Sequence, residues 1–411
     1  MPLLVMKFGG TSVATPDRIR RAAKRVGREV ANGHDVIVIV SAMAGETNKL
    51  VALVGEIAPF YDAREYDAVV SSGENVTAGL MALTLQEMGV PARSWQGWQV
   101  PINTTSAHGA ARFESIPTDN INRKFAEGMK VAVVAGFQGI SKEGRITTLG
   151  RGGSDTTAVA FAAAFGAVRC DIYTDVDGIY TTDPRISPRA RKLDRIAFEE
   201  MLELASLGAK VLQTRSVELA MRYQVRLRVL SSFEDNDENA GTLVCAEEDI
   251  VESKAVSGVA YSRDEAKVTL TRVEDKPGIA AAIFGPLAET GVNVDMIVQN
   301  ISEEGFTDMT FSCPVDQVKR AQKAMTEARE RGDFVFAGLL TDTDVAKISV
   351  VGIGMRSHAG IAAQMFKALS AEGINIKVIT TSEIKISVLI DRKYTELAVQ
   401  ALHDAFGLET A

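Results

Sequence analysis

The sequence predicts an α/β protein in which a three-layer αβα domain with a mostly parallel central sheet precedes two ferredoxin-like βαββαβ domains. Three observations lead to this prediction. Apolar strand-like runs alternate with amphipathic helices between Leu3 and Val244, a pattern typical of a parallel sheet covered on both faces. The chain then repeats itself at an interval of 82 residues. Its length of 411 residues suits several domains of roughly 100 to 200 residues each.

The first half contains three clear buried strands and three strong helices. We expect strands over residues 3–8, 36–40 and 131–137, because each is a short apolar run. A helix should follow the first strand, with Thr15 as its N-cap, Pro16 at the first helical position and Gly33 placed to end it. Two more helices are expected over about 74–88 and from 154 or 155 to about 165, each directly after a glycine-containing loop.

The character of the chain changes after Ser231. The stretch 233–241 is acidic, polar and closed by a glycine, which is typical of a surface loop near the end of a domain. We therefore expect domains over 1–245, 265–337 and 345–411. Whether a strand over 256–262 pairs into the last of these is left open.

The second half contains an internal duplication. Residues 277–300 align without gaps on residues 359–382. The matched identities are Gly278, Ile279, Ala280, Ala281, Phe284, Leu287, Gly291 and Asn293 with Gly360, Ile361, Ala362, Ala363, Phe366, Leu369, Gly373 and Asn375. Each copy is predicted to form one βαββαβ unit, and such sheets usually pair with each other or across a dimer.

Composition and charge exclude several classes of protein. Apolar residues make up 46% of the chain and the formal net charge is −8, so nucleic acid is a poor ligand for the whole molecule. The longest apolar run, 158–168, is too short to cross a bilayer, and residues 1–10 lack the form of a signal peptide, so we expect a cytoplasmic protein without a membrane partner. The three cysteines are widely spaced, and we interpret them as reduced, mostly buried thiols.

Two glycine-containing loops follow predicted strands, where ligands bind in parallel α/β sheets. In residues 7–12 (KFGGTS), Lys7 supplies a cation, while Gly9 and Gly10 let the backbone approach a phosphate. For the two glycines alone, an ordinary strand-to-helix turn is the favoured interpretation. Residues 147–157 (TTLGRGGSDTT) are more specific, because three glycines surround Arg151 and cap-type residues follow. Here we favour a binding function over a merely capped helix.

Other polar groups follow further strands. Ser41 and Thr47 come after the second strand, and Glu74 could hold an ammonium group or simply be a first-turn helix acid. Residues 173–185 form a long acidic and aromatic loop able to hold a nucleoside, and Lys210 is either a second phosphate ligand or a solvated lysine. P-loop, GxGxxG, protein-kinase and HExxH motifs are all absent. Lysine, arginine, hydroxyls and backbone N–H groups remain, and these are the groups that catalyse phosphoryl transfer.

Four motifs in this order resemble aspartate kinase of the amino acid kinase superfamily: KFGGTS at 7–12, SSGE at 71–74, TTLGRGGSDTTA at 147–158 and YTDVDGIYTTDPR at 173–185. The duplicated copies resemble its ACT regulatory domains. The resemblance implies an amino acid kinase-like fold and phosphorylation of the side-chain carboxylate of L-aspartate, with ATP and Mg²⁺, to 4-phospho-L-aspartate. This is the entry step to lysine, threonine, methionine and diaminopimelate.

The resemblance also implies roles for particular residues. Lys7, Asp155 and Lys210 would be catalytic. The ATP site would comprise Lys7, Phe8, Gly9, Gly10, Thr174, Asp175, Tyr180, Arg185 and Lys210. The aspartate site would comprise Ser41, Thr47, Glu74, Arg151, Gly152, Gly153 and Ser154. The residues that hold Mg²⁺ are left open.

For the ACT-like copies, the resemblance implies feedback by lysine, threonine or both, and a homo-oligomer formed through these copies. The effector residues would be Asp275, Lys276, Pro277, Gly278, Ile279, Asn293, Val294, Asp295, Gln299, Asn375, Thr381 and Ser382. The alternative is that the copies only build a dimer. Two rival functions also stay open: a kinase of glutamate or N-acetylglutamate, which shares the glycine loops, and a catalytically silent amino-acid sensor.

Overall fold

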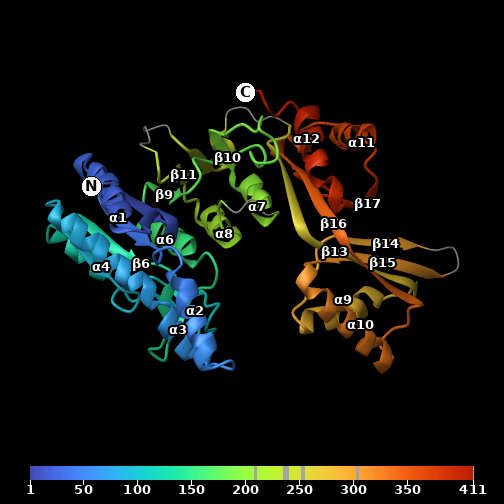
Figure 1. Ribbon diagram of the computed structural model, residues 1–411, viewed down its shortest axis with the longest axis horizontal. Helices are drawn as coiled ribbons and strands as arrows, with labels where there is room; N and C mark the ends of the chain where they lie inside the picture. The colour runs from blue at the N-terminus through green and yellow to red at the C-terminus, as the bar shows by residue number, and fades with distance from the viewer. Residues whose placement is uncertain (208–210, 235–239, 251–254, 302–304, 411) are drawn as a thin grey trace. The chain divides into compact units, whose positions relative to one another are not determined.

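A computed structural model describes residues 1–207, 211–234, 240–250, 255–301 and 305–410 (Figure 1). The chain divides into two compact units. The first comprises residues 1–179, 192–205 and 210–251, and the second comprises residues 180–191, 206–209 and 252–411. The segment 180–191 therefore belongs to the second unit, although it lies within the first half of the sequence.

The first unit is built on a mostly parallel sheet, as predicted. Among the described residues its eight strands follow the order β10-β12-β11-β9-β1-β2-β6-β3, and only β11 and β12 pair antiparallel. A smaller sheet has the order β5-β4-β7-β8. The strands are β1 (Leu3–Phe8), β2 (Asp35–Val40), β3 (Ala92–Trp95), β4 (Asn103–Thr104), β5 (Phe113–Ser115), β6 (Val131–Ala135), β7 (Gln138–Ile140), β8 (Ile146–Thr148), β9 (Arg169–Thr174), β10 (Arg195–Ala197), β11 (Leu227–Ser231) and β12 (Thr242–Cys245).

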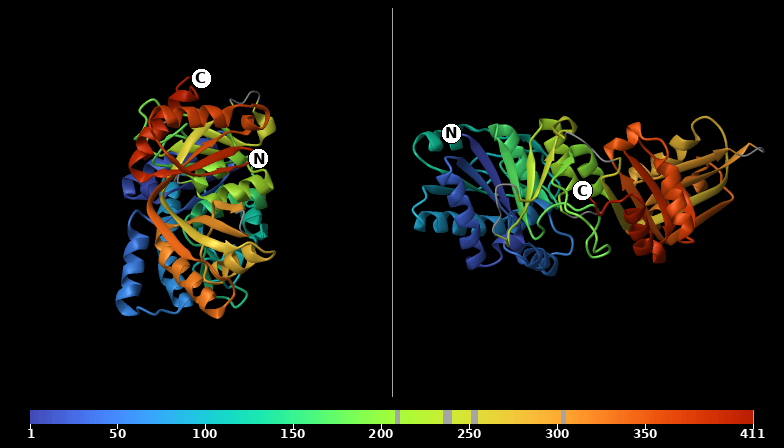
Figure 2. Two further views of the ribbon diagram at one scale, coloured as in Figure 1. Left: turned by 90° about the vertical axis from the view of Figure 1, so that its right-hand side faces the viewer. Right: turned by 90° about the horizontal axis from the view of Figure 1, so that it is seen from above.

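Helices cover both faces of the large sheet, which gives the predicted three layers (Figures 1 and 2). α1 and α4 pack on one face over a core of apolar side chains from β1, β2 and β6, and α6 packs with α8 on the other face. The helices are η1 (Gly10–Val13), α1 (Pro16–Ala31), α2 (Glu46–Ile57), α3 (Ala63–Val70), α4 (Ser72–Glu87), α5 (Asp119–Ala126), α6 (Gly153–Phe165), α7 (Phe198–Ser206), α8 (Thr214–Tyr223) and η2 (Glu247–Asp249).

Local sequence explains most of these boundaries. The Thr15 side chain accepts a hydrogen bond from the Arg18 N–H at the start of α1, and Gly33 follows its end with φ +92°, both as predicted. Two expectations were wrong in detail. The strand expected over 131–137 ends at Ala135, because Phe137 turns the chain with φ +68°. The helix expected from 154 or 155 begins earlier, at Gly153, because Gly152 is its left-handed N-cap.

The second unit contains one six-stranded sheet within the described residues, in the order β14-β15-β13-β16-β18-β17. The two ACT-like copies share its two long central strands. Residues 266–274 of β13 pair with β15, whereas residues 258–262 pair with 347–351 of β16. The elements are β13 (Gly258–Glu274), α9 (Ile279–Glu289), β14 (Ile297–Ile301), β15 (Phe306–Cys313), η3 (Val315–Gln317), α10 (Val318–Arg331), β16 (Gly338–Val351), η4 (Ile353–Ser357), α11 (Ile361–Ala371), β17 (Ile376–Thr381), β18 (Lys385–Asp391), η5 (Arg392–Tyr394) and α12 (Thr395–Ala405).

In Figure 1 the long strands β13 and β16 run through the whole second unit, with α9 and α10 at one end and α11 and α12 at the other. Each helix pair buries its own apolar core against the sheet, and those cores are separate. All three cysteines are free and buried, which confirms the prediction of reduced thiols. Burial raises the pKa of the Cys313 thiol to about 11.

Candidate active site

The carboxyl ends of four parallel strands meet at one edge of the large sheet. Backbone hydrogen bonds join them: the Gly9 N–H donates to the Tyr173 carbonyl (3.2 Å), the Ser41 N–H to the Phe8 carbonyl (3.2 Å), and the Gly136 N–H to the Val40 carbonyl (3.0 Å). The loops after β1, β2, β6 and β9 therefore lie side by side. This is the edge where ligands bind in open α/β sheets, and all four sequence motifs have residues at it or in contact with it.

A buried ion pair links the first and third motifs. Lys7 on β1 is 8% exposed, and its Nζ lies 2.5 Å from Oδ1 of Asp155 in the first turn of α6. The pair places one cation and the N-terminal end of a helix at the same point of the strand edge. Both groups favour a bound anion there, because unpaired helix N–H groups carry partial positive charge.

Close approach of the backbone requires glycine at position 10. A Cβ on Gly10 would lie 2.9 Å from the Ala42 carbonyl oxygen, and a Cβ on Gly9 would lie 3.4 Å from the Lys7 ammonium. The backbone beside Lys7 is thus kept free of side-chain atoms. That arrangement suits a ligand that approaches both the lysine and the neighbouring N–H groups.

The second glycine loop is a tight turn before α6. Gly150 and Gly152 have φ values of +78° and +74°, and a Cβ on Gly152 would lie 1.9 Å from Cγ of Gln213. A Cβ on Gly153 would lie 2.8 Å from the Phe137 ring. Between these glycines Arg151 is exposed, whereas Ser154 is buried beside Gly136. The turn therefore presents the Arg151 guanidinium to solvent from a closely fitted backbone.

Glu74 is a buried carboxyl group in the first turn of α4. It is 3% exposed, and its Oε1 accepts a hydrogen bond from the Ala42 N–H at 3.1 Å. Its Oε2 is buried and has no hydrogen-bond partner among the described residues. Burial raises the pKa of this carboxyl group to about 7. Ser41, which directly precedes Ala42 in the sequence, and Thr47 are both half-buried. A buried carboxylate with one unused oxygen is suited to receive a cationic group.

The predicted nucleotide residues fall in different places. Thr174 ends β9, and its hydroxyl donates to Oδ1 of Asp175 at 3.2 Å. The Thr174 carbonyl accepts two hydrogen bonds of 2.8 Å from the backbone and hydroxyl of Ser232. Tyr180 and Arg185 lie in the second unit, where Arg185 pairs with Asp183 at 2.7 Å. Lys210 lies outside the described residues.

Sequence reasoning missed two polar residues that brace the second glycine loop, the buried Asp67 and the half-buried Arg215. Asp67 on α3 accepts hydrogen bonds from the N–H and hydroxyl of Thr148, and Arg215 on α8 donates to the Leu149 carbonyl. Asp67 precedes the SSGE motif by four residues, but a single acid in a helical pattern carries no sequence signal of burial. Arg215 looks like an ordinary helix arginine. Neither role could have been found without the tertiary contacts.

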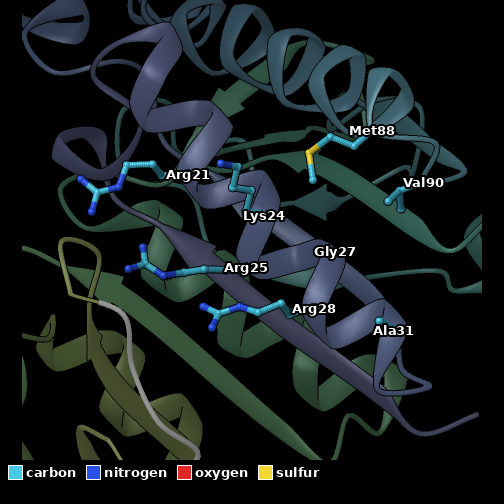
Figure 3. A pocket seen from close by; sticks show the side chains of 8 residues that line it. All are labelled: Arg21, Lys24, Arg25, Gly27, Arg28, Ala31, Met88 and Val90. Atoms are coloured by element: carbon cyan, nitrogen blue, oxygen red, sulfur yellow. The ribbon is translucent and has the colours of Figure 1, made fainter.

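A separate surface pocket lies on α1 and shows no overlap with these motifs (Figure 3). It is lined by Arg21, Lys24, Arg25, Gly27, Arg28, Ala31, Met88 and Val90. Arg25 is buried and donates to the Ser232 carbonyl at 2.5 Å. The pocket lies along α1, and its Arg25 guanidinium is 5.5 Å from the centre of the Tyr173 ring near the carboxyl end of β9.

The predicted effector residues lie in the turns and edge strands of the second unit. Residues 275–279 lead into α9, Gln299 is on β14, and Thr381 ends β17. Asp295 already has a partner, because its Oδ2 lies 2.6 Å from Nζ of Lys347, which also pairs with Glu265 at 2.6 Å. Asp295 follows the first copy's helix, whereas Lys347 is on the second copy's strand. The bridge thus joins the two copies.

Two features are absent from the described part of the chain. None of its helices is both long and apolar enough to span a membrane. In the same residues, no group of three or more histidine, cysteine or acidic side chains is placed to hold a metal ion.

Comparison with known proteins identifies the family. The model of the amino acid kinase family matches residues 2–231, and two models of the ACT domain match residues 267–332 and 348–406. The chain is 52% identical over 411 residues to an aspartate kinase of Pseudomonas putida, covering 100% of this chain and 98% of that protein. It is 47% identical over 413 residues to an aspartokinase of Mycolicibacterium smegmatis, covering 99% and 97%.

Solved structures agree with this result. The crystal structure of E. coli aspartokinase III in complex with aspartate and ADP matches with a TM-score of 0.81 at 28% identity, over 98% of this chain and 99% of that one. A second structure of the same enzyme, in complex with lysine and aspartate, matches with a TM-score of 0.76. The fold and the strand-edge site define a kinase of the amino acid kinase family with two ACT domains. Within that family, the full-length relatives show that the chain belongs to the aspartate kinases.

Proposed function

We propose that this enzyme transfers the γ-phosphoryl group of ATP to the side-chain carboxylate of L-aspartate and forms 4-phospho-L-aspartate and ADP. A carboxylate oxygen attacks the γ-phosphorus, and the bond from that phosphorus to the β–γ bridging oxygen breaks. No general base is needed, because a carboxylate with a reference pKa of about 3.9 is already ionised at neutral pH. The observation that carries the proposal is the meeting of Lys7 and Asp155 at the strand edge.

The main barrier is charge repulsion between an anionic nucleophile and a polyanionic triphosphate. Lys7 would neutralise phosphate charge, assisted by the backbone N–H of Gly10 and by Lys210. Mg²⁺ usually keeps several waters and binds through one or two carboxylates plus substrate phosphates. Mg²⁺ bound with ATP would neutralise phosphate charge, and Asp155, beside Lys7, could supply a carboxylate ligand.

The amino acid would be held by both of its ends. The Arg151 guanidinium suits the α-carboxylate, because its fork can donate two parallel hydrogen bonds. Glu74 suits the α-ammonium through its unused Oε2. Ser41, Thr47 and residues 152–154 would surround the rest of the substrate. The side-chain carboxylate would then be aimed at the γ-phosphate.

The nucleotide would occupy the neighbouring strand ends. Phe8, Gly9 and Gly10 would contact the phosphates, and Thr174 and Asp175 would lie near the ribose or base. Support comes from the homologous E. coli structure, which contains ADP together with aspartate.

Trapping the acyl phosphate with hydroxylamine tests the proposal directly. The purified chain is incubated with ATP, Mg²⁺ and hydroxylamine, and with aspartate, glutamate or N-acetylglutamate in turn. We expect a hydroxamate with aspartate only. A hydroxamate with one of the other acids instead would reassign the substrate, and none with any acid would leave the amino-acid sensor as the function.

We further propose feedback by lysine, threonine or both through the ACT domains, with the effector residues named above. One support is the lysine-bound structure of E. coli aspartokinase III. Another is the docking of segment 180–191 on the second copy. The Thr181 hydroxyl lies 2.9 Å from Nε2 of the buried His403, and the Thr181 carbonyl accepts the Val259 N–H at 2.8 Å. This segment follows Thr174 and Asp175 in sequence, so the chain connects these two nucleotide residues to the second copy.

Titration with each amino acid tests this regulation. Lysine or threonine should lower the rate of hydroxamate formation and raise the melting temperature, because a ligand that binds the folded state stabilises it. If neither amino acid changes either quantity, the ACT domains only build the assembly. We also propose that the product enters the synthesis of lysine, threonine, methionine and diaminopimelate. A further proposal is that the protein forms a homo-oligomer through its ACT domains, which light scattering would detect.

A further inference from the structure

The Asp67 carboxylate is buried in the first unit at the centre of a hydrogen-bond cluster. Its side chain is 0% exposed. The cluster's donors are the Thr148 N–H (3.0 Å), the Thr148 hydroxyl (2.5 Å), the Gly109 N–H (3.1 Å) and Nδ1 of His108 (2.8 Å). Four donors around one carboxylate satisfy an ionised group, which accepts hydrogen bonds and donates none.

This carboxylate holds the start of the loop that presents Arg151. Thr148 ends β8, and the turn through Gly150 and Gly152 follows it directly. A second brace comes from Arg215, whose guanidinium donates to the carbonyls of Leu149 and Ala111 at 3.0 Å each. The loop backbone is thus fixed on its inner side while Arg151 itself stays exposed.

Asp67 also belongs to the segment that carries Glu74. Its backbone carbonyl accepts the Ser71 N–H at 3.2 Å, at the junction where α3 ends and α4 begins. Glu74 follows in the first turn of α4. One residue therefore ties together the two chain segments that present Arg151 and Glu74.

We propose that Asp67 is a positioning residue that sets the separation between Arg151 and Glu74, and hence between the carboxylate and ammonium subsites for the amino acid. The inference rests on the function proposed above. A buried carboxylate stabilises a protein less than an apolar side chain of similar size would. We therefore interpret the role of Asp67 as geometric. Displacement of the loop would misplace Arg151 relative to Glu74 and leave the nucleotide contacts at Lys7 and Gly9 in place.

The test is a comparison of KM values in the full-length enzyme. Asp67→Asn places an amide NH₂ against N–H and hydroxyl donors, so we expect the KM for aspartate to rise at least about tenfold, as for a lost charge-assisted hydrogen bond. The KM for ATP should change less than about twofold. The matched control is Asp62→Asn, the same substitution at the exposed N-cap of the same helix, where its side chain accepts only from Arg64 in the described structure. The control should leave both KM values unchanged.

A second pair of variants covers the case in which Asp67→Asn does not fold. Thr148→Val removes one charge-assisted hydroxyl donor and keeps the shape and the N–H, so the KM for aspartate should rise about tenfold. Thr148→Ser restores the hydroxyl and should restore the KM. The inference is overturned if both KM values change equally. It is also overturned if the melting temperature falls while the ratio of the KM for aspartate to the KM for ATP stays the same, because Asp67 would then have a merely structural role. Absence of aspartyl hydroxamate with the wild-type enzyme would instead refute the proposed function.

Discussion

The ammonium group of Lys7 and the carboxylate of Asp155 form a buried ion pair of 2.5 Å between the first strand of the sheet and the first turn of α6. The pair brings together two motifs that are far apart in sequence. The two charges neutralise each other within the protein, so an incoming triphosphate would compete with Asp155 for Lys7. The cation is therefore held in place before the nucleotide binds, which lowers the reorganisation that the reaction requires.

Replacement of Lys7 tests its role in phosphoryl transfer. Lys7→Ala should lower kcat by roughly 10² to 10³, the usual effect of removing one preorganised donor. Hydroxamate formation at saturating ATP and aspartate measures this rate. Lys24→Ala, an exposed lysine on α1, is the control and should leave kcat unchanged. Near-normal turnover of Lys7→Ala would remove Lys7 from the site.

Replacement of Arg151 tests which substrate the second glycine loop holds. Arg151→Ala should raise the KM for aspartate by roughly 10- to 100-fold, because the α-carboxylate loses a charged, bidentate partner. The KM for ATP should change little. Initial rates at varied concentrations of each substrate give both constants. A larger effect on the KM for ATP would reverse the assignment of the two subsites.

The sequence predicted the architecture well because periodicity and glycine placement are local properties. The alternating runs indicated the parallel sheet, and Thr15 and Gly33 marked the ends of α1. Asp67 was missed, because its role depends on Thr148, which is distant in sequence and joins it only in the folded unit. The start of α6 was misplaced for a related reason. Ser154 is a good capping residue, but the left-handed turn at Gly152 begins the helix one residue earlier.

The pH dependence of aspartate capture follows from Glu74. Burial raises the pKa of this carboxyl group to about 7, and only its ionised form can pair with the substrate's ammonium group. The KM for aspartate should therefore rise as the pH falls below about 7, by up to about tenfold per pH unit. The aspartate side chain stays ionised throughout this range, so it does not contribute. Steady-state kinetics between pH 6 and 8 measure the effect, and a KM that stays flat for the wild type would contradict it. Glu74→Gln should have a high KM that is independent of pH.

The same buried charge should cost stability at high pH. The folded-state pKa of Glu74 lies above the unfolded value, so the folded protein loses stability as the pH rises from about 4.5 to 7. Glu74→Gln avoids this cost, because its amide oxygen can still accept the Ala42 N–H. Urea unfolding should show the variant to be more stable by up to about 3 kcal/mol at pH 8, shrinking to about 1 kcal/mol at pH 5. If Glu74→Gln is less stable than the wild type at pH 8, the Glu74 charge is already compensated in the folded protein.

The left-handed turn at Gly152 should tolerate no side chain. Gly152→Ala must adopt φ +74°, which costs an L-residue about 1–2 kcal/mol, and its Cβ would lie 1.9 Å from Cγ of Gln213. Gln213 must then move, and the neighbouring Arg151 with it, so we expect lower stability in urea together with a raised KM for aspartate. Gly55→Ala is the matched control, because Gly55 lies in α2 with open space around its Cβ position. There alanine should be neutral or stabilise the fold by up to about 1 kcal/mol, through its higher helix propensity. Equal behaviour of the two variants would mean that the turn can relax without cost, and that the glycines are not what positions Arg151.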